Sequence, residues 1–115
     1  MKIIEIKKII EKTLDENKAS NIITINLKKK SYIADYMIIA SGTSSRHIQS
    51  LSEILLAKLK NSGIENCRIE GRESNDWKLV DVIDIIVHIF HPKKRKFYDI
   101  EKMWSEPIPK EKIVV

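Results

Sequence analysis

The feature that most restricts the fold is an unbroken apolar run that leads directly into a polar turn. Residues 36–40 (YMIIA) show no alternation of apolar and polar side chains. An apolar run of this length is typical of a strand that is covered on both faces, at a central position in a sheet. Residues 41–45 (SGTSS) follow at once, and Ser44 or Ser45 can cap a helix that begins there. The sequence therefore predicts a strand–turn–helix unit.

The rest of the hydrophobic pattern extends this unit into an α/β domain. Apolar residues at helical spacing predict helices over 3–16, from about 45 to a stop at Gly63, and over 97–104. Alternating or β-branched segments predict further strands over 22–27, 67–70, 77–82 and 84–90. The order of these elements predicts a mixed sheet of about five strands with helices packed on it.

The length of the chain, 115 residues, suits one domain with one core. We expect this domain to span residues 1–104 and residues 105–115 to form an irregular tail. No apolar run approaches the roughly 18 residues that cross a bilayer, so no membrane contact is expected. The single cysteine, Cys67, rules out an internal disulfide, and the N-terminus does not resemble a secretory signal. We therefore expect a cytoplasmic protein.

The net charge of +5 admits two interpretations. A basic surface suits a partner that is anionic, such as RNA or an RNA-rich assembly. Alternatively, the lysines only solvate the surface. The chain is rich in Lys, Ile and Asn together, as products of AT-rich genomes tend to be, so its lysines need not reflect a partner. Basic residues cluster at 28–30 and 93–96, both in predicted turns.

Two aspartates, taken together with the polar turn, raise the hypothesis of a nucleotidyltransferase-like, metal-dependent enzyme. In such sites paired carboxylates usually lie two residues apart, because alternate residues of a strand share a face. Asp81 and Asp84 are three apart, and the turn at 41–45 lacks the lysine of a phosphate-binding loop. We therefore expect no catalytic residues, no metal site and no cofactor. His88 lies alone in a strand, and we expect it to be packed and hydrogen-bonded.

Trp77 and Tyr98 are candidate anchors for a binding partner. Trp77 begins a strand after a polar loop, and Tyr98 lies off the apolar stripe of the last predicted helix. Trp and Tyr bury much area at low entropic cost, so they are favoured at interfaces. The alternative is that either ring covers the edge of the core.

Four blocks of residues stand out between about residue 22 and residue 104. They are DYMIIASGTSSRH at 35–47, Glu70-Gly71 with Trp77 downstream, DIIVHIF at 84–90 and RKFYDIEKMW at 95–104. Together and in this order, they resemble the pattern of the Iojap or ribosomal silencing factor family. The sequence departs from the pattern at Ile83, where Gly is usual, and at Met103, where Leu is usual.

This resemblance implies a nucleotidyltransferase-like fold without enzymatic activity. It implies binding to the large ribosomal subunit through its fourteenth large-subunit protein, at the subunit interface, which blocks subunit joining and represses translation. The residues that it places on the binding face are Trp77, Leu79, Asp81 and Tyr98. Contact with nearby ribosomal RNA and a homodimer of the free protein stay open. The alternatives are the metal-dependent enzyme and a small RNA-binding module.

Overall fold

The computed structural model describes residues 2–28, 34–71, 74–93 and 95. The helix expected over 97–104 and the tail expected over 105–115 lie outside these residues. The described elements, in chain order, are α1 (Ile3–Glu16), β1 (Ser20–Asn26), β2 (Tyr36–Ser41), α2 (Ser45–Asn61), β3 (Cys67–Glu70), β4 (Trp77–Val82) and β5 (Ile85–Phe90).

The five strands form one sheet in the order β1-β2-β5-β4-β3, with β2 and β5 parallel and the other neighbours antiparallel. The mixed five-stranded α/β sheet predicted from the sequence is thus confirmed. All six residues of β2 are buried, in keeping with its predicted position inside the sheet. The predicted likeness to nucleotidyltransferases stays a prediction.

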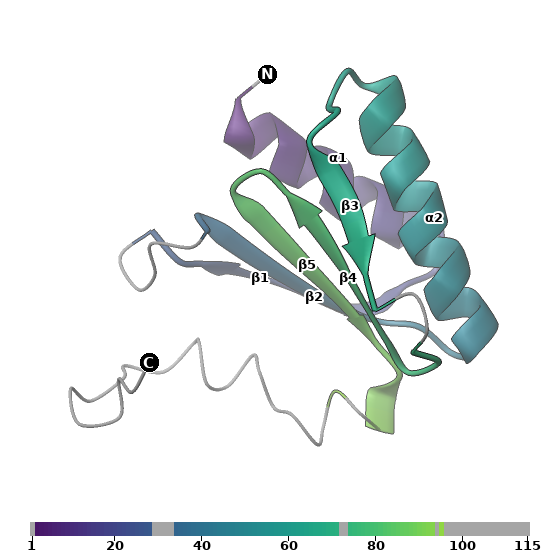
Figure 1. Ribbon diagram of the computed structural model, residues 1–115. Helices are drawn as coiled ribbons and strands as arrows, with labels where there is room; N and C mark the ends of the chain where they lie inside the picture. The colour runs from purple at the N-terminus through teal and green to yellow at the C-terminus, as the bar shows by residue number, and fades with distance from the viewer. Residues whose placement is uncertain (1, 29–33, 72–73, 94, 96–115) are drawn as a thin grey trace, which may run out of the picture.

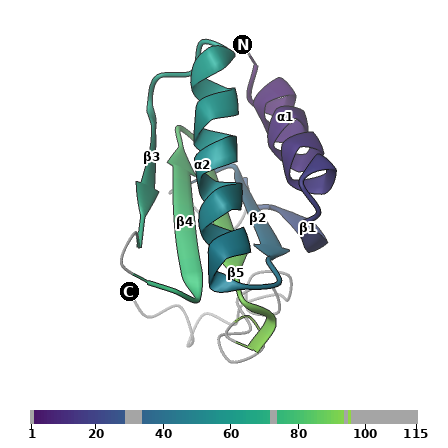
Figure 2. The same cartoon turned by 90° about the vertical axis from the view of Figure 1, so that its right-hand side faces the viewer.

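Both described helices pack on the same face of the sheet (Figure 1, Figure 2). The reason is visible in their sequences, where apolar residues recur every three or four positions and so form one stripe on each helix. From α1 these are Ile6, Ile10 and Leu14, and from α2 they are Ile48, Leu51, Leu55 and Leu59. They meet alternate residues of the strands, including Ile38, Val80 and Val87, in the larger core cluster.

The turn before α2 is shaped by ordinary helix capping. Ser44 is the N-cap, and its Oγ accepts a hydrogen bond from the backbone N–H of His47 at 3.1 Å. The Nδ1 of His47 accepts from the N–H of Thr43 at 2.9 Å, so Nε2 carries the proton and donates to the carbonyl of Asn17 at 2.9 Å. His47 thereby joins the start of α2 to the end of α1. Gly42 is needed because a Cβ there would lie 2.7 Å from Cγ1 of Ile48.

The turn between β4 and β5 differs from the predicted one. We expected Asp84 inside the last strand, but β5 begins at Ile85 and Asp84 lies in the turn. Its carbonyl accepts from the N–H of Asp35 at 2.7 Å, which ties the turn to the start of β2. Ile83, the position where the family usually has Gly, adopts a φ of +51°. A β-branched residue rarely adopts this left-handed conformation, so the turn is strained.

Within the described segments, neither helix combines the length and the hydropathy that a membrane span requires.

Candidate functional site

The candidate binding residues lie on the sheet face opposite the two helices. In β4 the burial pattern alternates strictly: Val80 and Val82 are buried against the helices, while Trp77, Leu79 and Asp81 are partly exposed. Alternate residues of a strand share a face, so these three side chains are in one row. Three of the four predicted site residues are thus brought together. Tyr98, the fourth, lies outside the described residues.

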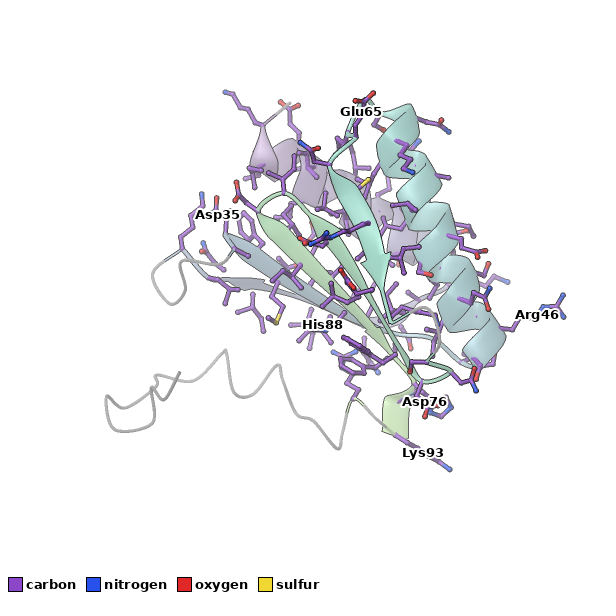
Figure 3. All side chains as sticks on the ribbon, viewed as in Figure 1. Asp35, Arg46, Glu65, Asp76, His88 and Lys93 are labelled. Atoms are coloured by element: carbon purple, nitrogen blue, oxygen red, sulfur yellow. The ribbon has the colours of Figure 1, made fainter. Side chains whose placement is uncertain are left out.

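Trp77 is part of a group of three rings on this face. It is directly opposite Phe90 on β5, and its ring centroid is 6.1 Å from that of His88 and 6.3 Å from that of Phe90. His88 and Phe90 are nearly parallel, with 9° between their planes and 5.6 Å between their centroids. Figure 3 shows His88 on the side of the sheet away from the helices. The three rings form a continuous aromatic row.

The indole N–H of Trp77 is paired within the protein. It donates to Nδ1 of His88 at 3.1 Å. Burial lowers the pKa of His88 to about 4, so the ring is neutral near pH 7 and Nδ1 is free to accept. The expectation that His88 is packed and hydrogen-bonded is confirmed.

The other two site residues of β4, Leu79 and Asp81, lie beside residues of β3 and β5. Leu79 is opposite His88 on β5 and Glu70 on β3, and Asp81 is opposite Arg68. The Nε of Arg68 lies 3.8 Å from Oδ2 of Asp81 and 3.4 Å from Oε1 of Glu70. Because both carboxylates and the guanidinium are well exposed to water, these ion pairs are weak and easily exchanged.

Arg68 and Glu70 were not among the residues predicted for the site. The strand over 67–70 was predicted, but only the register between β3 and β4 places Arg68 beside Asp81. That register depends on contacts between residues far apart in the sequence, which local patterns do not report.

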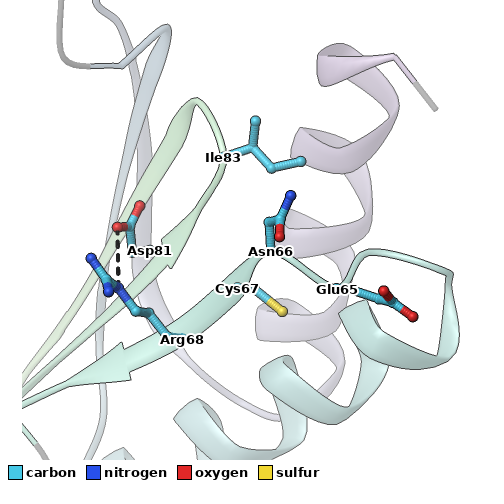
Figure 4. A pocket seen from close by; sticks show the side chains of 6 residues that line it. All are labelled: Glu65, Asn66, Cys67, Arg68, Asp81 and Ile83. Carbon is cyan, nitrogen blue, oxygen red and sulfur yellow. Dashed lines mark ion pairs between the residues drawn. The ribbon is translucent and has the colours of Figure 1, made fainter.

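A pocket of about 390 Å³ opens beside this row, at the end of the sheet near the β4–β5 turn (Figure 4). Its lining side chains come from β3 with the residues before it and from β4 with the turn after it. They are Glu65, Asn66, Cys67, Arg68, Asp81 and Ile83. The strained Ile83 is about half exposed there, with 48% of its surface accessible. The pocket therefore combines an apolar wall with charged groups of both signs.

Cys67 in this pocket is not activated as a nucleophile. Burial raises the pKa of its thiol, and the nearby charge of Lys60 offsets this only in part. The thiol donates to the carbonyl of Ile64 at 3.4 Å. A reactive cysteine needs a stabilised thiolate, which this environment does not provide.

The carboxylates considered for catalysis are held in separate settings. Asp81 lies on β4 beside Arg68, whereas Asp84 lies in the next turn. Across the described part of the chain, no group of three or more His, Cys, Asp or Glu side chains is placed to hold a metal ion.

The two described residues of the basic cluster at 93–96 differ in their exposure to solvent. Lys93 is exposed (Figure 3), but Arg95 is buried and its Nη1 donates to Oγ of Ser41 at 2.9 Å. Arg95 therefore serves packing at the end of the sheet, and the solvent-facing charge of this cluster is smaller than the sequence suggested.

Comparison with known proteins gives consistent matches. A family model described as "Ribosomal silencing factor during starvation" matches residues 1–114. The ribosomal silencing factor RsfS of Zymomonas mobilis is 44% identical over 98 residues, which are 85% of this chain and 74% of that protein. The RsfS of Chromobacterium violaceum is 37% identical over 109 residues, 95% of this chain and 89% of that one. A crystal structure of a Chromobacterium violaceum protein superposes with a TM-score of 0.88 at 36% identity, covering 100% of this chain and 95% of that one.

Proposed function

The chain belongs to the ribosomal silencing factor family, and from this membership we propose that it binds the large ribosomal subunit through its fourteenth large-subunit protein. Binding there, at the subunit interface, keeps the small subunit from joining and represses translation. The observation that carries the proposal is the row of Trp77, Leu79 and Asp81, partly exposed on the face away from the helices.

Each residue of the row suits a protein partner. The Trp77 ring and the Leu79 side chain offer apolar area, and Asp81 can exchange its pairing with Arg68 for a cation on the partner. Apolar anchors ringed by polar groups are typical of protein interfaces. We propose that Tyr98 completes this face, within a binding domain that spans residues 1–104 and is followed by a tail at 105–115.

The mechanism needs no covalent chemistry. A standard interface buries about 800 Å² on each partner. A bound domain with principal extents of 41 × 34 × 22 Å fills space that the small subunit must occupy. We propose that the protein transfers no nucleotide, since Asp81 lies on β4 beside Arg68 while Asp84 lies in the next turn.

The basic surplus of the chain fits a setting rich in RNA. We propose that exposed lysines and arginines speed encounter with the subunit and contact ribosomal RNA next to the protein partner. We propose that the protein acts in the cytoplasm. When it is free, its binding face is available for a homodimer.

The test is co-sedimentation of the purified protein with separated ribosomal subunits. We expect binding to large subunits and not to small ones, and inhibition of subunit joining in proportion to the bound fraction. Equal binding to both subunits, or to neither, would contradict the proposal.

The same assay tests the binding face. Trp77→Ala should weaken large-subunit binding at least tenfold, about 1.4 kcal/mol, because truncation of an anchor removes a large apolar contact. Ile54→Ala is the matched control, since Ile54 is an exposed apolar residue on α2, on the other side of the sheet. Equal affinities of the two folded variants would show that the row is not the interface.

A further inference from the structure

The Trp77 indole is held at two opposite edges. At its pyrrole edge, Nε1 donates to Nδ1 of His88. At its benzene edge, the backbone of Gly71 lies so close that a Cβ on Gly71 would be 3.0 Å from both Cε3 and Cζ3. A side chain contacted at both ends cannot rotate without moving one of its neighbours.

Gly71 is itself fixed by a buried cation. The Nζ of Lys78 donates to the carbonyl of Gly71 at 2.9 Å and also to the carbonyl of Ser74. Lys78 is only 4% exposed and extends to the helix-covered face, whereas Trp77 extends to the other. Gly71 therefore contacts two consecutive residues, Trp77 and Lys78, that point to opposite sides of the sheet.

We propose that Gly71, Lys78 and His88 are positioning residues that hold the Trp77 indole in its binding orientation before the partner arrives. We call these three residues the Trp77 clamp. The inference rests on the proposed function, because it presumes that the indole is an anchor on the large-subunit binding face.

The clamp has a physical advantage for binding. Ordering a mobile side chain at an interface costs free energy, and a residue that is already ordered avoids that cost. The clamp also occupies the indole N–H, so the partner meets the ring through its carbon surface. The matching group on the partner is thus an apolar or cationic side chain rather than a hydrogen-bond acceptor.

Two substitutions at His88 separate the hydrogen bond from the packing. His88→Phe keeps a flat ring in the aromatic row but removes the acceptor. His88→Asn loses the ring but places an oxygen at about the position of Nδ1. We expect His88→Phe to weaken large-subunit binding about fivefold, mainly through faster dissociation, and His88→Asn to bind within about twofold of the wild type.

A nuclear magnetic resonance measurement of the indole N–H reports the clamp directly. The Trp77 signal should shift and broaden in His88→Phe and return toward its original position in His88→Asn. The indole of Trp104 is the internal reference, since Trp104 and Trp77 are the two tryptophans of the chain. Gly71→Ala should disturb the same signal, because its methyl group would meet the ring and its φ of +75° disfavours alanine.

The outcomes distinguish this inference from the proposed function. Loss of binding in Trp77→Ala together with unchanged binding in His88→Phe would overturn the clamp alone. Equal weakening by His88→Phe and His88→Asn would also overturn it, because packing rather than the acceptor would then matter. In a Trp77→Phe background, which has no indole N–H, His88→Phe should weaken binding no further. A second fivefold loss there would contradict the positioning role.

Discussion

The two faces of the sheet are built from the same strands but carry different chemistry. On the helix-covered face, β4 and β5 present aliphatic residues such as Val80, Val82 and Val87, all with 0% exposure. On the opposite face, the same strands present an indole, an imidazole and a carboxylate in register. Because successive residues of a strand alternate between faces, one segment of chain can meet the needs of packing and of partner binding independently. Substitutions on the two faces should therefore separate stability from affinity.

The largest effect is expected on the helix-covered face. Leu55→Ala should lower the free energy of unfolding by about 2–5 kcal/mol, because Leu55 is fully buried between α2 and the sheet and its loss leaves a cavity. Urea denaturation followed by circular dichroism measures this change. The fraction that remains folded should bind large subunits like the wild type. A weaker affinity of that folded fraction would mean that the two faces are not independent.

The next largest effect is expected on the opposite face, where the contribution of His88 to stability should depend on pH. The pKa of His88 is lowered to about 4 in the folded protein, against about 6.5 in an unfolded chain, so the unfolded state takes up the proton more readily. The contribution of His88 to stability is complete above pH 6.5 and is lost as the pH falls toward 4, by up to about 3 kcal/mol. Thermal unfolding between pH 4 and pH 7 measures it, and the profile of His88→Phe should be flatter in this range. Parallel profiles for both proteins would contradict this assignment.

Neighbouring residues of β4 give the most direct comparison. Val80→Ala should cost about 2 kcal/mol of stability, because Val80 is fully buried against the helices. Leu79→Ala removes more carbon atoms, yet it should cost less stability because Leu79 is partly exposed, while it weakens large-subunit binding severalfold. Paired measurements of unfolding and binding test both. The comparison fails if Val80→Ala weakens the affinity of folded protein more than Leu79→Ala does.

The smallest effect is expected at the turn that joins β4 to β5. Ile83→Gly should raise the free energy of unfolding by about 1 kcal/mol, because glycine adopts the φ of +51° without steric cost. Half of the Ile83 surface is already exposed, so little burial is lost. Thermal unfolding of this variant measures the gain. A lower midpoint would show that the side chain contributes more in the pocket than the backbone strain removes.

Much of the fold could be predicted from short-range patterns. Helix α1 and the strand over 77–82 have the predicted bounds, because the spacing of apolar residues reports directly which face of an element is buried. The prediction was wrong for Asp84, since the β-branched run after it hid a turn whose shape is set by contacts with Asp35. The predicted start of β1 was two residues too late, because the strand begins with a bulge near Ser20.

The candidate site was less accessible to such reasoning. The alternation in β4 was enough to group Trp77, Leu79 and Asp81. The hydrogen bond to His88 and the contact with Gly71 join residues across a hairpin and around a loop. These contacts follow from strand order and register, which are properties of the assembled sheet.

The order of the strands also constrains how the chain folds as it is synthesised. The connection through α2 leads from β2 to β3 at the far edge of the sheet (Figure 2), and the two strands between them, β5 and β4, come after both in the sequence. When residues 1–70 have left the ribosome, β1 and β2 can pair, but β3 has no neighbouring strand. The apolar side chains of α2 can then pack on only part of the sheet. The sheet can be completed only after residues 77–90 emerge and the β4–β5 hairpin inserts between β2 and β3. Because this pairing joins strands that are far apart in the sequence and cannot begin earlier, we expect the nascent protein to fold in one late step, once residues 77–90 have emerged.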